Sequence, residues 1–143
     1  MDKLGIKNFK AWMIIKEKID LAARKRSVKE GDVWWSSIGE NVGDEICGKG
    51  EAYTRPVLVL RKLDKYTFWA VPLTSKEHKG SWYVPFELNG RLQVAVVSQI
   101  QNMSVSRLRR RMGQLTNGDY SKVFKAFLGL LLAGQKIRPS HED

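Results

Sequence analysis

Cysteine and histidine are scarce in this chain of 143 residues, and their scarcity excludes several kinds of site. Cys47 is the only cysteine, so neither an intrachain disulfide nor a cysteine-based metal site can form. The two histidines, His78 and His141, are too few and too far apart in sequence to indicate a metal cluster. We therefore expect no metal site and no cofactor.

Long hydrophobic runs are also lacking. No apolar stretch approaches the ~20 residues that a helix needs to span a bilayer. The first ten residues, MDKLGIKNFK, lack the continuous apolar segment of a secretory signal. The sequence therefore predicts a protein of the reducing cytoplasm that does not insert into a membrane.

Acidic residues are outnumbered by basic ones, 15 to 25, which gives a net charge of +10. This balance favours a polyanionic partner, either a nucleic acid or an anionic membrane surface. The alternative is a soluble protein that is merely basic. The hydrophobic fraction of 43% and the five tryptophans predict a folded chain, and its length suits one domain with a substantial core.

The spacing of apolar residues predicts a mainly β domain with appended helices, an α+β fold. We expect a helix over 8–26, with Asn8 as its N-cap and Trp12 on the face that packs against the domain or a partner. Short strands are expected over 33–38, 56–63, 66–73, 82–88 and 92–97, with 98–103 continuing or bending the last one, then a short arginine-rich helix over 106–112 and a final helix over 119–133. Such short strands favour a small, strongly bent barrel or half-barrel.

Finer features of these strands can also be predicted. The apolar run over 57–60 indicates a strand that is buried on both faces. Pro85 suits an edge strand or a bulge, and Asn89-Gly90 is a hairpin turn signal. At least two of the arginines over 107–111 are expected on a solvated helix face, with an ion pair at Arg107 or Arg110.

Arg55 and Thr74 lie at the edges of two predicted strands. Arg55 opens the apolar run RPVLVL, and Thr74 lies within PLTSK. A long, polar, glycine-bearing loop over 39–54 precedes Arg55, and a charged loop follows Thr74. An arginine and a hydroxyl held by strands between polar loops are typical of a site for an anionic ligand. The alternative is that both are ordinary polar residues at strand ends.

The order of five motifs resembles that of the MazF/PemK toxins of type II toxin–antitoxin pairs. The motifs are GDVWWSSIGENVGDE, RPVLVL, PLTSK, SQIQ and SRLRRRMGQL, within residues 29 to 133. The resemblance implies a small SH3-like barrel with appended helices, usually paired as a homodimer. It divides the chain into an N-terminal helical extension (1–28), a toxin domain (29–134) and a flexible tail (135–143).

The resemblance also implies an activity and a partner. Family members are metal-independent endoribonucleases that cut single-stranded mRNA at short sequences, leaving a 2′,3′-cyclic phosphate and a 5′-hydroxyl, and a cognate antitoxin blocks them. By motif, Arg55 matches the catalytic arginine and Thr74 the catalytic hydroxyl, with Ser75 as the adjacent polar residue. Glu45 matches the acidic residue of the loop before Arg55. That loop is longer here than in the shortest members, so the RNA sequence cut cannot be carried over.

Basic and aromatic residues near these motifs are candidates for contacts with RNA. Phosphate contacts are expected from Lys49, Lys76, Lys79 and Arg91, and base stacking from Trp82 or Tyr83, unless these aromatic rings pack within the protein. Two alternatives keep the fold and drop the catalysis, because a fold alone does not fix a function. One is a CcdB-like toxin that binds DNA gyrase, and the other is a non-catalytic RNA-binding barrel.

Overall fold

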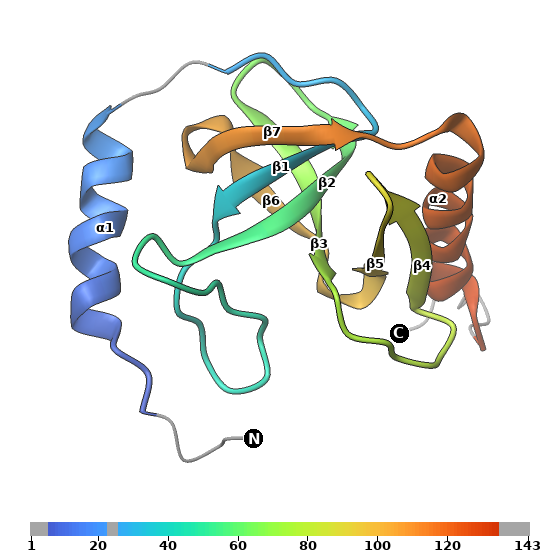
Figure 1. Ribbon diagram of the computed structural model, residues 1–143, viewed down its shortest axis with the longest axis horizontal. Helices are drawn as coiled ribbons and strands as arrows, with labels where there is room; N and C mark the ends of the chain where they lie inside the picture. The colour runs from blue at the N-terminus through green and yellow to red at the C-terminus, as the bar shows by residue number, and fades with distance from the viewer. Residues whose placement is uncertain (1–5, 23–25, 135–143) are drawn as a thin grey trace, which may run out of the picture.

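Seven antiparallel strands form one curled sheet, and a helix lies on each side of it (Figure 1). The computed structural model describes residues 6–22 and 26–134. The strands are β1 (Asp32–Ser37), β2 (Thr54–Lys62), β3 (Thr67–Thr74), β4 (Tyr83–Leu88), β5 (Arg91–Val96), β6 (Gln101–Ser104) and β7 (Leu108–Gln114), and the helices are α1 (Phe9–Ala22) and α2 (Asn117–Leu132). This half-barrel confirms the predicted class, a mainly β fold with appended helices. No described helix is long and apolar enough to cross a membrane.

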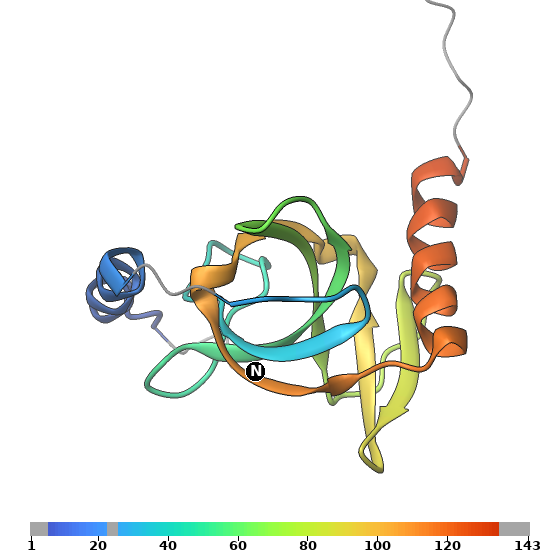
Figure 2. The ribbon, with the colours of Figure 1, turned by 90° about the horizontal axis from the view of Figure 1, so that it is seen from above.

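One edge of β3 pairs with two different strands. The strand order is β4-β5-β3-β2-β1-β7, and β6 also pairs with β3. Residues 67–70 of β3 pair with β6, whereas Leu73 and Thr74 pair with β5. The short 3-10 helix η1 (Val97–Gln99) carries the chain from β5 to β6. Figure 2 shows the strands wrapping around a common interior, with α1 and α2 on opposite sides.

The core lies on both faces of β2. Leu58 and Leu60 belong to a cluster that α2 covers, and Val57 and Val59 belong to a second cluster on the other face. All four side chains are at most 1% exposed, which confirms the prediction of a strand buried on both faces. The rim of the sheet also agrees with the sequence, because Pro85 lies in the edge strand β4. The turn from β4 to β5 is Asn89-Gly90, with positive φ angles of 55° and 78°.

The arginine-rich segment is a strand, so the helix predicted over 106–112 is wrong. A short 3-10 helix, η2 (Val105–Arg107), leads into β7, which pairs with β1. The helix propensity of its four arginines favours a helix, but hydrogen-bonded pairing with β1 overrides this local preference. Leu108 is fully buried opposite Ser36, and Gly113 lies opposite Val33 within the strand instead of ending a helix.

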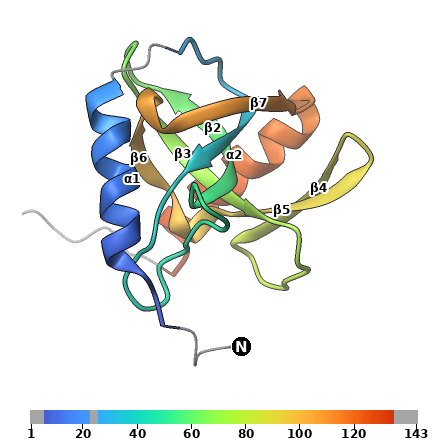
Figure 3. The same cartoon turned by 60° about the vertical axis from the view of Figure 1, so that its left-hand side comes forward.

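Helix α1 packs against the rest of the protein through Trp12. Asn8 Oδ1 accepts a hydrogen bond from Ala11 N at 3.0 Å, which confirms the predicted N-cap. Trp12 is 4% exposed and packs over Gly39, where an added Cβ would lie 2.3 Å from the indole ring. Tyr53 lies on the same indole, with ring centroids 5.5 Å apart. Figure 3 shows α1 beside the segment that leads into β7. Residues 23–25, the end of the predicted helix, and the predicted tail 135–143 are outside the described ranges.

Candidate active site

A cleft brings Arg55 and Thr74 together at one end of the curled sheet. Its volume is about 380 Å³, and β1, β2, β3, β5 and β7 all contribute to its walls. Its polar lining residues include Lys49, Thr54, Arg55, Thr74, Ser75 and Arg91. Three of these are cations and three carry hydroxyls, so the cleft has the chemistry of an anion-binding site.

Arg55 is half-buried and bonded to backbone carbonyls. Its Nε donates to Cys47 O at 2.8 Å and its Nη1 donates to Leu73 O at 3.2 Å. Within residues 6–22 and 26–134, its Nη2 makes no hydrogen bond and no carboxylate pairs with it. Burial lowers the pKa of the Arg55 guanidinium from its ordinary value, and the nearby Cys47 thiol partly opposes the shift. A guanidinium stays protonated in proteins, so Arg55 presents an unneutralised charge with donors left for a ligand.

Thr74 ends β3 opposite Val94 of β5. Its Oγ1 accepts a hydrogen bond from Lys76 N at 3.3 Å, which fixes the start of the following loop. The hydroxyl hydrogen remains able to donate, because the bond from Lys76 uses only a lone pair. Ser75 follows Thr74 on the wall of the cleft.

The predicted substrate-binding residues divide into two groups. Lys49 and Ser75 line the cleft beside Arg55, as does Arg91. Glu45, Lys76, Lys79 and Trp82 are exposed and are not among its lining residues. Glu45 Oε1 instead accepts from Val42 N at 3.1 Å within its own turn. The roles of these residues toward RNA remain predictions.

The exposed loop after Thr74 carries a row of aromatic rings. His78 and Tyr83 stack with centroids 4.6 Å apart, and Tyr83 lies 6.1 Å from Trp82. Trp82 itself is 41% exposed. Tyr83 is half-buried and stacks on His78, whereas Trp82 keeps an accessible face. Stacking of either ring on an RNA base stays a prediction.

Trp35 is a cleft residue that the sequence interpretation missed. It follows Trp34, which is 7% exposed, and successive side chains of a strand point to opposite faces. The two tryptophans of β1 therefore point to opposite faces, and Trp35 is the one residue of this strand that is only half-buried. Gln93 and Met112 also line the cleft and carried no comparable signal.

The long loop between β1 and β2 is held in place by side chains from distant segments. Gln99 Oε1 accepts from Ile46 N at 2.8 Å, and Gln99 Nε2 donates to Asp44 O at 3.0 Å. Lys7 Nζ donates to Asn41 O at 2.5 Å and to Gly43 O at 2.9 Å. Together with the bond from Arg55 to Cys47 O, these contacts fix the loop beside the cleft.

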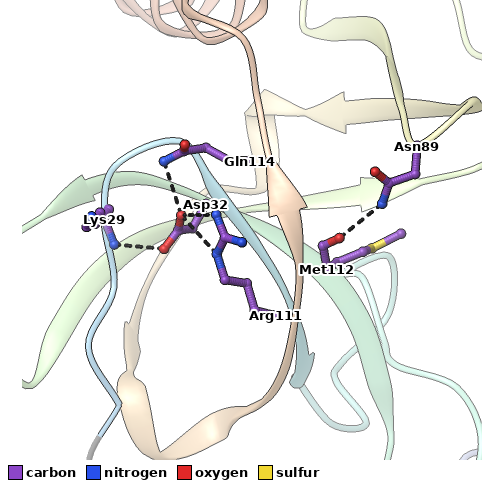
Figure 4. Close-up of polar contacts among 6 residues, drawn as sticks. All are labelled: Lys29, Asp32, Asn89, Arg111, Met112 and Gln114. Carbon is purple, nitrogen blue, oxygen red and sulfur yellow. Dashed lines mark hydrogen bonds and ion pairs between the residues drawn. The ribbon is translucent and has the colours of Figure 1, made fainter.

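A second charged cluster links the neighbouring strands β1 and β7 (Figure 4). Asp32 is 3% exposed. Its Oδ1 accepts from Arg111 Nη2 at 3.2 Å and from Gln114 Nε2 at 3.3 Å, and its Oδ2 accepts from Lys29 N at 2.9 Å. The ion pair of this segment is therefore at Arg111, and the expectation of one at Arg107 or Arg110 is wrong for the described residues.

The other arginines of this segment differ in their surroundings. Arg107 Nη1 donates to Ser37 O at 3.1 Å, and its guanidinium lies 5.9 Å from the Trp12 ring centroid. Burial lowers the pKa of Arg107. Arg109 and Arg110 are exposed, as expected, although on a strand and not on a helix.

Known proteins resemble this chain in sequence pattern and in fold. Residues 29–131 match the family model described as PemK-like, MazF-like toxin of type II toxin-antitoxin system, which confirms the resemblance inferred from the motifs. MazF from Deinococcus radiodurans is 18% identical, with a TM-score of 0.59 over 74% of this chain and 97% of that one. The Mycobacterium tuberculosis toxin MazF-mt6 is 19% identical, with a TM-score of 0.53 over 69% and 93%.

A further similar structure is an endoribonuclease in complex with its cognate antitoxin from a mycobacterial species. It is 14% identical, with a TM-score of 0.59 over 77% of this chain and 100% of that one. At these identities the likeness shows the fold alone. A search of curated proteins gave no significant match.

Proposed function

This chain belongs to the PemK-like, MazF-like toxin family of type II toxin–antitoxin systems, and we propose that it is an endoribonuclease that cuts single-stranded RNA in the Arg55 cleft. One observation carries the proposal. The cleft is lined by Lys49, Arg55 and Arg91, and no carboxylate is among its described lining residues. A cleft of this kind attracts a phosphodiester, which carries one negative charge per nucleotide.

The proposed reaction is attack of a ribose 2′-oxygen on the adjacent phosphorus. The bond from phosphorus to the 5′-oxygen breaks, leaving a 2′,3′-cyclic phosphate on one product and a 5′-hydroxyl on the other. Negative charge grows on the non-bridging oxygens in the transition state, and preorganised donors lower its energy. Arg55 is suited to this task because its Nη2 and the second hydrogen of Nη1 remain for two charge-assisted bonds. Thr74 adds a neutral donor at the same phosphate.

The site has fewer groups for proton transfer than for charge stabilisation. The 2′-hydroxyl must lose a proton and the leaving 5′-oxygen must gain one. No histidine and no carboxylate lines the cleft in the described part of the chain, so we assign both transfers to water. Rate enhancement then comes from charge stabilisation and from the orientation of bound RNA.

The test is incubation of the purified protein with a long RNA in EDTA, followed by mapping of the new ends. We expect cleavage at a short recurring sequence, with cyclic phosphate and 5′-hydroxyl ends. Activity that disappears in EDTA and returns with a divalent ion would contradict the proposed chemistry. Intact RNA combined with inhibition of DNA gyrase would support the CcdB-like alternative, and bound but uncut RNA would support a non-catalytic barrel.

We also propose that the protein acts as a homodimer and is neutralised by a cognate antitoxin. Leu128, Leu131 and Leu132 of α2 are 43%, 56% and 70% exposed, and Trp69 packs beside them against Phe127 at a centroid distance of 6.2 Å. An apolar face of this kind is typical of an interface. Light scattering should give the mass of two chains at micromolar concentration, and an active monomer would contradict the dimer.

A further inference from the structure

The Arg55 cleft opens into a continuous basic track that leads away from it. A neighbouring hollow is lined by Trp35, Ala52, Thr54, Arg109 and Arg110, and it shares Trp35 and Thr54 with the cleft. A further hollow shares Ala52 and Arg109 and reaches Lys18 of α1. We call these two hollows the lateral track. It runs from Thr54 across β7 to the N-terminal helix.

A β-bulge explains why two successive arginines line the track. In a regular strand, neighbouring side chains point to opposite faces. Here Trp35 pairs with Arg110 and Ser36 pairs with Leu108, so Arg109 is an additional residue in β7. A bulge re-aims side chains in this way, and Arg109 and Arg110 consequently line the same hollow.

The charges of the track are strongly one-sided. Its cations are Lys18, Arg107, Arg109 and Arg110, and its only described acidic lining residue is Glu51. Arg109 and Arg110 have no carboxylate within ion-pair distance among residues 6–22 and 26–134, whereas Arg111 next to them is paired with Asp32. The strand therefore neutralises one arginine and leaves two for a ligand.

The ligand that fits is the backbone of single-stranded RNA. It repeats a negative charge along a flexible line and carries flat bases. Trp35 lies where the cleft and the track meet, half-buried, so it offers an indole to an unpaired base close to Arg55. An acidic protein segment would match the charges but would gain less from an aromatic residue at that junction.

We propose that the lateral track binds RNA that extends beyond the phosphate in the Arg55 cleft, with Arg109, Arg110 and Lys18 as phosphate contacts. The inference rests on the proposed ribonuclease function. It also gives α1 a role, because α1 lies outside the residues 29–131 that match the family model. The N-terminal helix thereby lengthens the surface that holds the substrate.

The test measures binding of 2′-O-methylated oligouridines, which cannot be cleaved, by fluorescence anisotropy at several salt concentrations. The probes have about 4 and about 16 nucleotides, the range of site sizes known for small single-strand binders. The double variant R109Q/R110Q should lose most of the affinity advantage of the long probe over the short one. For the long probe, the slope of log affinity against log salt should fall in magnitude by about 1.4, because each phosphate contact contributes about 0.7.

Three further variants make the result specific. R109K/R110K keeps both charges and should keep most of the slope, and Lys18→Gln alone should reduce it by about 0.7. K122Q/K125Q removes the same charge from exposed positions on α2 and should leave the slope unchanged. Circular dichroism confirms folding of each variant.

Several outcomes would overturn the inference. These are an unchanged slope in R109Q/R110Q, an equal fall in K122Q/K125Q, or loss of polyglutamate binding while RNA affinity is retained. The last outcome would assign the track to an acidic protein segment. The results also distinguish failure of the track from failure of the proposed ribonuclease function. If the wild type cuts RNA but the slope does not change, only the track fails, whereas a reduced slope without any cleavage supports the track and contradicts the nuclease.

Discussion

Arg55 and Arg111 mark two charged regions of the same sheet, and their guanidinium groups have opposite kinds of partner. Arg111 donates to the carboxylate of Asp32, which is itself buried and also bonded to Gln114 and Lys29. Arg55 donates only to the carbonyls of Cys47 and Leu73 among the described residues. One cation is paired with a buried carboxylate, and the other is held in position by neutral groups.

The difference separates a structural cluster from a candidate active site. An ion pair with several hydrogen bonds ties β7 to β1, and its charges cancel at short range. Carbonyl groups orient the Arg55 guanidinium without cancelling its charge, so the attraction remains for a phosphate that enters the cleft. Desolvation of Arg55 strengthens that attraction, because charge interactions are less screened away from bulk water.

Arg55→Ala should give the largest effect on cleavage. We expect the rate to fall by about 10² to 10³, or 2.7–4 kcal/mol, by analogy with removal of one oxyanion donor. The measurement is single-turnover cleavage of one mapped oligonucleotide under saturating enzyme, with folding checked by circular dichroism. Arg111→Gln is the matched control and should cut at the wild-type rate. A folded Arg55→Ala that cuts normally would show that Arg55 serves binding or structure.

Asp32→Ala should give the largest effect on stability. It removes the acceptor of part-buried bonds from Arg111, Gln114 and Lys29, and a hydrogen bond to a charged group contributes about 1.5–3 kcal/mol. Urea unfolding measures the loss, and the cleavage rate of the folded variant should remain that of the wild type. Unchanged stability together with reduced cleavage would mean that the two regions are coupled.

Most of the fold could be predicted from the sequence, because the apolar pattern of a single segment is enough to indicate its structure. The run over 57–60 read as doubly buried, and Asn89-Gly90 read as a hairpin, since each feature depends on its own residues. The prediction for 106–112 was wrong because its arginines are as compatible with a helix as with a strand. Its structure is decided by pairing with β1, which lies about 75 positions earlier in the chain.

The site was predictable in part for the same reason. Arg55 lies near the start of β2 and Thr74 at the end of β3. These neighbouring strands are antiparallel, so both residues lie at the same end of the sheet, in one cleft. Glu45 belongs to a loop whose path is set by bonds from Lys7 and Gln99, and no local pattern reports those distant contacts. The lateral track was hidden because a β-bulge, and not the sequence alternation, brings its arginines to one face.

Thr74→Val should have a smaller effect than Arg55→Ala, since a neutral hydrogen bond is weaker than a charged one. We expect a loss of about 0.5–1.5 kcal/mol in transition-state stabilisation, which corresponds to a few-fold to about tenfold slower cleavage. The variant also loses the acceptor for Lys76 N, so Thr74→Ser is the control that retains both functions of the hydroxyl. Equal rates for the valine and serine variants in single turnover would remove Thr74 from the chemistry.

His78→Gln should have the smallest effect, and it tests whether the Arg55 cleft works without histidine acid–base chemistry. His78 stacks on Tyr83 outside the residues that line the cleft. Histidine is the side chain that ordinarily changes charge between about pH 5 and 8, and a pair of such groups would give a bell-shaped rate profile. Burial lowers the pKa of Arg55, which moves loss of its charge toward neutrality, but a guanidinium still keeps its proton throughout that range. The single-turnover rate should therefore rise steadily with pH as the 2′-oxygen loses its proton more readily, and the wild-type and His78→Gln profiles should coincide. A falling limb that disappears in the variant would make His78 a proton donor and would extend the active site into the loop after Thr74.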